Sequence, residues 1–94
     1  MKIKDLIFPS YVLDKLIWKH HVSEREVRQI FRNKPMIRFL EKGRVGAENL
    51  YVALGQTDSG RYLSVFFIYK RNQKALIISA RDMDAKERKL YGRK

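Results

Sequence analysis

Apolar residues in the first third of the chain recur at helical spacing. They fall at Val12, Leu13, Leu16 and Ile17, and His20 continues the same stripe. This spacing predicts a helix from Tyr11 to His21 with one buried face. Pro9 and Ser10 precede it, and Ser10 is expected to be its N-cap.

A second helix is predicted directly after the first. Ser23 and Glu26 have the spacing of a capping box, in which each side chain bonds the backbone N–H of the other residue. Val22 and Val27 flank this pair at the positions of a hydrophobic staple. The segment Asn33-Lys34-Pro35 is expected to end the helix, because the residue before a proline avoids helical backbone angles.

After Pro35 the apolar pattern changes to one typical of strands. Four strands are predicted, at Met36 to Glu41, Asn49 to Gly55, Arg61 to Tyr69 and Ala75 to Ala80. The loops between them are short enough for antiparallel hairpins, and they cover Lys42 to Glu48, Gln56 to Gly60 and Lys70 to Lys74. Near the start of the chain, Ile3 to Phe8 is either a short first strand or an arm.

The third and fourth predicted strands are apolar at nearly every position, so we expect them to be central and covered on both faces. Asp84 and Glu87 then repeat the capping-box spacing and predict a last helix, which Gly92 ends. The sequence therefore predicts a single α+β domain over residues 1–94. It has two N-terminal helices, a four-stranded, mainly antiparallel sheet and a short C-terminal helix.

The charge of the chain narrows the choice of partners. There are 21 Lys and Arg against 10 Asp and Glu, a formal charge of +11 with a pI near 10.2. This balance favours a nucleic acid bound through its phosphates, with a solubilising surface or an acidic protein partner as the alternatives. The chain has no cysteine, which excludes disulfides and thiolate metal sites. No apolar run reaches the length of a membrane span, so a cytoplasmic location is expected.

Arginines at the strand ends are the first candidates for phosphate contacts, because the guanidinium group stays charged and its planar fork matches a phosphate. Arg81 follows the apolar run of the fourth strand, and Arg61 begins the third. In an antiparallel pair these two lie at the same end of the sheet, with Arg71 at the opposite end. Each is alternatively a solvated strand end or an ion-pair partner of Asp82 or Glu87.

Other side chains are candidates for proton transfer and for binding. His20 titrates near neutral pH, and Lys19 precedes it, although His20 is equally well explained as a half-buried core residue. Tyr91 shares a helix face with Glu87 and either packs on the sheet or offers its hydroxyl group. Trp18 and Tyr11 point away from the apolar stripe, which is typical of a contact surface. The adjacent His20 and His21 diverge on a helix, so no metal site is expected. The sequence has no Gly-rich phosphate loop, so no cofactor is expected either.

Several of these segments together resemble the BrnT family of type II toxins, small ribonucleases of the RelE-like superfamily. The resemblance runs from Lys19 to Tyr91. It rests on Lys19-His20-His21-Val22-Ser23, on Ala53-Leu54-Gly55-Gln56-Thr57 followed by Gly60-Arg61, on the apolar strand before Arg71, on Ile77-Ile78-Ser79-Ala80-Arg81, and on Glu87 and Tyr91. His21 stands where the family has a glycine.

The resemblance implies an RNA endonuclease that needs no metal, is toxic when free and is neutralised by an antitoxin encoded beside it. The implied partners are that antitoxin and RNA, in particular messenger RNA, free or held on the ribosome. The implied catalytic residues are Arg81, Arg61, His20 and Tyr91, and the implied RNA contacts are Lys19 and Arg71. From the residues alone, a basic module that binds RNA or DNA without cleaving it stays open, as does a pure interaction protein.

Overall fold

The change of pattern at Pro35 divides the fold into a helical layer and a sheet. The computed structural model describes residues 1–44 and 48–93. Its elements in chain order are β1 (Asp5–Ile7), α1 (Ser10–His20), α2 (Glu24–Arg32), β2 (Met36–Glu41), β3 (Leu50–Gln56), β4 (Tyr62–Tyr69), β5 (Lys74–Asp82) and α3 (Ala85–Tyr91). The α+β class, the two N-terminal helices and the short C-terminal helix are confirmed.

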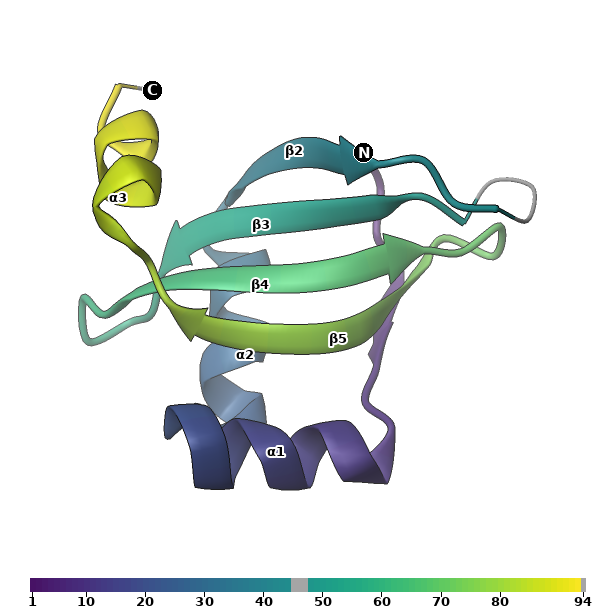
Figure 1. Ribbon diagram of the computed structural model, residues 1–94, viewed down its shortest axis with the longest axis horizontal. Coiled ribbons are helices and arrows are strands. Elements are labelled where there is room, and N and C mark those ends of the chain that lie inside the picture. The colour runs from purple at the N-terminus through teal and green to yellow at the C-terminus, as the bar shows by residue number, and fades with distance from the viewer. Residues whose placement is uncertain (45–47, 94) are drawn as a thin grey trace.

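The sheet has five strands, not the four that were predicted. Its order is β1-β5-β4-β3-β2, with antiparallel pairs from β2 to β5 and a parallel pair between β1 and β5 (Figure 1). The additional strand comes from the segment Ile3 to Phe8, which the sequence left as a strand or an arm. Its strand part is only three residues long, too short to carry a clear alternation of apolar and polar positions. Part of the predicted loop Lys42 to Glu48 lies outside the described residues.

The helices α1 and α2 cover one face of the sheet and enclose the core. The buried side chains there come from both layers and include Val12, Leu16, Val27, Ile30, Leu63, Val65, Phe67 and Ile77. On the other face, Phe66, Ile68, Leu76 and Ile78 are only half-buried. The strands β4 and β5 are central in the sheet, as predicted, but the prediction that both of their faces are covered holds only at the α3 end, where Ser64 is buried. We call this second face the open face; α3 stands at one end of it, beyond the end of β5 (Figure 1).

Both capping boxes are confirmed, whereas the predicted N-cap of α1 is wrong. Ser23 with Glu26, and Asp84 with Glu87, form both reciprocal bonds. In α1 the N-cap is Pro9, with no side-chain cap bond; Ser10 is already helical, and the Pro9 carbonyl accepts the first helical N–H bonds. At the other end, His21 closes α1 with a φ of 54°. This left-handed backbone favours glycine, which accounts for the glycine that the resemblance expects at that position.

A β-bulge in β5 decides which face carries Arg81. Phe66 pairs with Ser79 but Phe67 pairs with Ile77, which leaves Ile78 as an additional residue. Because side chains alternate between faces, one additional residue reverses every position that follows it. Ala80 therefore joins Ile77 in the core, and Arg81 faces the same side as its register partner Ser64, on the open face.

Candidate active site

Arg81 is held at the α3 end of the open face by a bidentate ion pair. Its two terminal nitrogens donate to the carboxylate oxygens of Glu87 at 2.7 and 3.0 Å, and one of them also donates to the Asp82 carbonyl at 3.1 Å. The guanidinium group lies over the Phe66 ring, 5.1 Å from its centre. The Arg81 side chain is nevertheless 36% exposed, so a phosphate from solvent can reach this fixed cation.

Glu87 is the central acceptor of this group. Besides Arg81, it accepts hydrogen bonds from the buried Ser64 hydroxyl at 2.9 Å and from the Asp84 backbone N–H at 2.9 Å. Burial works to raise the pKa of Glu87, but the bonds from Arg81, Asp84 and Ser64 outweigh it and the pKa is lowered. Glu87 is therefore a carboxylate at neutral pH, with only 18% of its side chain exposed.

Aromatic and basic side chains of α3 extend the same site. The Tyr91 ring meets the Tyr62 ring edge-on, with 6.0 Å between the ring centres. The Arg88 guanidinium lies over the other ring of this pair, 3.6 Å from the centre of Tyr62. The packing of α3 thus places Tyr91 and a second cation close to the pair of Arg81 and Glu87.

Arg61 lies on the other side of Asp82 and joins three elements of the fold. It donates to the Asp82 carboxylate at 2.8 and 3.3 Å, to the carbonyls of His21 and His20 at 2.8 and 3.2 Å, and to Glu26 at 3.2 Å. All three guanidinium nitrogens therefore have protein acceptors. The hydrogen bonds that Arg61 donates to Asp82 and Glu26 raise the pKa of Arg61 against the effect of burial. In return Arg61 lowers the pKa of Asp82 and, after the bond from the Ser23 backbone, that of Glu26.

His20 lies at the end of α1, near this second cluster. Burial is the largest cause of its lowered pKa, followed by the charges of Lys19, Lys15 and Arg81, whereas Asp82 acts to raise it. The imidazole is therefore neutral at pH 7 and able to accept a proton. Lys19 is exposed beside it.

The predicted site residues thus fall into one group and one outlier. Asp82 links the group: its carbonyl binds Arg81, its carboxylate binds Arg61, and its charge reaches His20. Tyr91 lies near this group because its ring packs against the Tyr62 ring when α3 folds over the end of the sheet. Arg71 is exposed in the turn between β4 and β5, at the opposite end of the sheet, where the antiparallel register predicted it.

Four further residues of the group were not among the predicted site residues. Glu87 was noted as a helix cap, as an ion-pair partner and within the family resemblance, and Asp82 only as an ion-pair partner. Ser64 and Arg88 carried no local signal, because a serine within an apolar strand and an arginine on a short helix occur in many proteins. The bonds that connect them are long-range pairs within the fold, which spacing along the sequence does not show.

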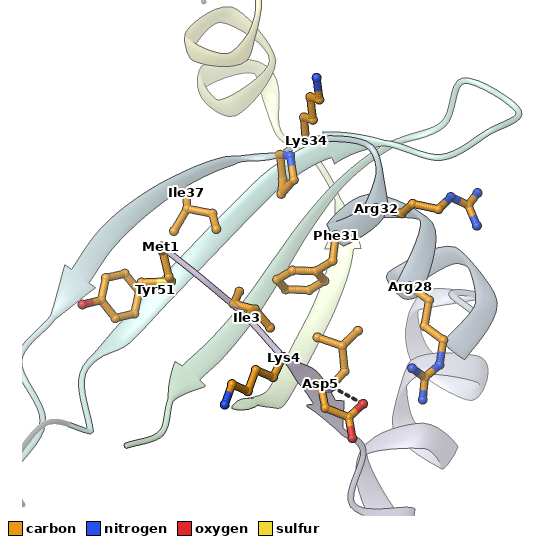
Figure 2. A pocket seen from close by; sticks show the side chains of 12 residues that line it. Met1, Ile3, Lys4, Asp5, Arg28, Phe31, Arg32, Lys34, Ile37 and Tyr51 are labelled. Carbon is orange, nitrogen blue, oxygen red and sulfur yellow. Dashed lines mark hydrogen bonds between the residues drawn. The ribbon is translucent and has the colours of Figure 1, made fainter. Parts of the chain in front are cut away.

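A groove lies away from this site, on the helix-covered side of the sheet (Figure 2). It has a volume of about 840 Å³ and runs between the N-terminal segment, α2 and β2. Phe31, Ile37 and Tyr51 are among its lining residues. Within residues 1–44 and 48–93, no cluster of three or more histidine, aspartate or glutamate side chains is placed to hold a metal ion. No helix in the described ranges is long and apolar enough to cross a membrane.

Comparison with known proteins places these observations in one family. No curated protein matches the chain. A family model described as the ribonuclease toxin, BrnT, of type II toxin–antitoxin systems matches residues 13–87. The matched span includes Lys19, His20, Arg61 and Arg81, and it ends at Glu87, before Tyr91. Since it covers well over half of the sequence, the chain belongs to the BrnT family of ribonuclease toxins of type II toxin–antitoxin systems.

Proposed function

We propose that RNA is cleaved at the α3 end of the open face, with Arg81 binding the scissile phosphate. The observation that carries this proposal is the Arg81 guanidinium, held in place by Glu87 yet 36% exposed beside the Phe66 ring. A positioned cation in a partly dehydrated site stabilises the extra negative charge of a phosphorane, and removing such a group often costs a factor of about 10²–10³ in rate.

The remaining groups supply proton transfer. The 2′-hydroxyl of the RNA attacks the adjacent phosphorus, a new O2′–P bond forms, and the P–O5′ bond breaks. His20, neutral at pH 7, accepts the proton of the 2′-hydroxyl, and the Tyr91 hydroxyl donates a proton to the departing 5′-oxygen. The products are a 2′,3′-cyclic phosphate and a free 5′-hydroxyl, and no metal is needed for any of these steps.

Two of the basic residues bind RNA outside the scissile phosphate. Lys19 contacts the backbone beside His20, and Arg71 contacts it at the far end of β4 and β5. We assign Arg61 a positioning role, because its nitrogens bond the carbonyls at the end of α1 and the carboxylates of Glu26 and Asp82. A direct bond from Arg61 to phosphate would require one of these contacts to break.

The proposal extends to the cellular role. The enzyme cleaves messenger RNA in the cytoplasm, whether free or on the ribosome, and so stops growth until the antitoxin binds it. The support is the family membership together with the basic charge of +11.

The test is cleavage of a short end-labelled RNA by purified wild type and by Arg81→Ala, with EDTA present. We expect wild type to give fragments with 2′,3′-cyclic phosphate ends and Arg81→Ala to be slower by about 10²–10³-fold. Arg28→Ala is the matched control, since Arg28 is an exposed arginine of α2 that pairs with Glu24 in the same helix and lies over the Phe8 ring. Its rate is expected to stay within about twofold of wild type.

Two outcomes would contradict the proposal. One is wild-type protein that binds RNA with a steep salt dependence and leaves it intact, which would favour a non-catalytic RNA-binding module. The other is an Arg81→Ala variant with unchanged cleavage. Arg81→Lys, which keeps the charge near Glu87, separates a loss of folding from a loss of the bidentate phosphate contact.

A further inference from the structure

The outward face of α1 carries large apolar side chains that the rest of the fold leaves bare. Trp18 is 83% exposed, Tyr11 71% and Ile17 56%. Residues seven apart on a helix lie almost in line, so Tyr11 and Trp18 form a stripe, with Ile17 beside it. Val12 and Leu16 occupy the inward side and are fully buried. In Figure 1, α1 lies at the margin of the molecule, with its outward side turned away from the sheet.

This arrangement is not needed for the fold. The core already takes its α1 contribution from the inward side, and apolar side chains in solvent favour association. Contiguous exposed apolar patches on small proteins mark contact surfaces, and tryptophan and tyrosine are enriched at the centres of protein interfaces. The outward face of α1 is therefore built to be covered by another molecule.

The charges around the patch indicate the chemistry of that molecule. Lys15 and Lys19 lie along one side of the aromatic stripe, Asp14 lies on its other side, next to Ile17, and the whole chain carries +11. A partner with apolar side chains flanked by acidic residues complements this surface. An RNA strand fits it less well, because the aliphatic Ile17 and the Asp14 carboxylate lie where the bases and phosphates would pass.

We propose that the outward face of α1, formed by Tyr11, Ile17 and Trp18, binds the antitoxin through an acidic segment with apolar anchors. The inhibitory effect of this binding rests on the proposed function, in which Lys19 and His20, the residues after Trp18 on the same helix, act on RNA. An antitoxin on this face reaches the exposed Lys19, which follows Trp18, and competes with RNA for it. Neutralisation then works by covering one side of the site, without any change in the fold.

Trp18 is itself the probe, because it is the only tryptophan of the chain. The purified antitoxin encoded beside the gene, in a form without tryptophan, is titrated into the full-length protein while the Trp18 emission is recorded. We expect a shift of the emission to shorter wavelength as the indole leaves water. Trp18→Ala is expected to weaken the affinity, measured by calorimetry, by about tenfold or more.

Phe39→Ala is the matched control, since Phe39 is another exposed aromatic residue, on β2. Its affinity for the antitoxin is expected to stay within about twofold of wild type. In cells, Trp18→Ala is expected to remain toxic but to escape neutralisation.

Three results would overturn the proposal. They are an antitoxin that does not bind, binding with unchanged emission and full affinity of Trp18→Ala, and a short RNA that quenches Trp18 and competes with the antitoxin. The second result would place the antitoxin elsewhere, for example in the groove of Figure 2. The fluorescence and calorimetry measurements do not depend on RNA cleavage, so they test this proposal even if the ribonuclease mechanism is wrong.

Discussion

Replacing Arg61 with alanine separates a positioning role from a direct contact with RNA. The guanidinium group connects the last carbonyls of α1 to the N-terminal turn of α2, through Glu26, and to the end of β5, through Asp82. Among the described residues, no other ion pair connects these elements. The variant therefore loses the contact that holds the end of α1 beside the sheet.

The size of the effect follows from these contacts. A hydrogen bond to a charged group contributes about 1.5–3 kcal/mol when well buried. The Arg61 side chain is 27% exposed, so solvent replaces part of each bond. The bond to Asp82, whose side chain is 66% exposed, is expected to add no more than about 1 kcal/mol. We expect a total loss of roughly 2–4 kcal/mol.

For a domain of this size, that loss corresponds to a fall in Tm of roughly 10–25 °C. Thermal unfolding followed by circular dichroism measures it, and Arg71→Ala, an exposed arginine in a turn, is the control with an expected change below about 0.5 kcal/mol. At a temperature where the variant is folded, the removal of Arg61 leaves the Asp82 charge uncompensated beside His20. Because Asp82 acts to raise the pKa of His20, the acidic limb of the rate profile should move to higher pH.

A different result would refute this reasoning. If Arg61→Ala unfolds within a few degrees of wild type and yet loses RNA cleavage with no change in the pH profile, Arg61 acts on the RNA and not on the fold. The contacts described above would then be secondary to phosphate binding.

Four further substitutions test other parts of the structure. Glu87→Gln should reduce the loss of stability on acidification. Folding lowers the pKa of Glu87, so its contribution to the free energy of unfolding is present above about pH 4.5 and is lost as the pH falls through the folded-state pKa. Urea unfolding of both proteins between about pH 3 and 6 measures the difference. His20→Asn should remove the acidic limb of the kcat/KM profile, whose midpoint in wild type lies below 6.5; a limb that persists in the variant would assign it to another group. Arg71→Ala should reduce the slope of log K against log salt for RNA by about one without changing Tm, and an unchanged slope would remove Arg71 from the RNA interface. His21→Gly should raise the free energy of unfolding by up to about 1 kcal/mol, since glycine relieves the positive φ; a loss of stability would show that the imidazole makes a compensating contact.

Local signals predicted most of the fold. The capping boxes at Ser23 and Asp84 fix helix starts by bonds within four residues, so the sequence contains all of the information. The switch to strand spacing after Pro35 is equally local. The number of strands and the open face were missed because they depend on which distant segments meet: β1 pairs with β5 across most of the chain. Ser10 was misjudged because serine is common both at the N-cap and at the first helical position.

The sequence predicted which basic residues lie together, but not most of the hydrogen bonds that hold them in place. The antiparallel register placed Arg61 and Arg81 at one end and Arg71 at the other, because a hairpin fixes register through its turn. Ion pairs with Asp82 and Glu87 were one of the two alternatives for these arginines, and the structure confirms them. The bonds from Arg61 to Glu26 and to the carbonyls at the end of α1 were not predictable. Glu87 lies six residues after Arg81 and meets it only because α3 turns back over the sheet, and Ser64 reaches Glu87 from a neighbouring strand.

The additional residue in β5 gives this site an unusual genetic property. Two residues, Ile78 and Ser79, occupy the place opposite Phe66 that one residue would fill in a regular strand. Deleting either one removes the bulge and leaves Ala80 opposite Val65 and Arg81 opposite Ser64, so the guanidinium stays on the open face. The same deletion in a regular strand would turn every following side chain to the other face. This stretch of β5 should therefore tolerate a one-residue deletion as well as substitutions.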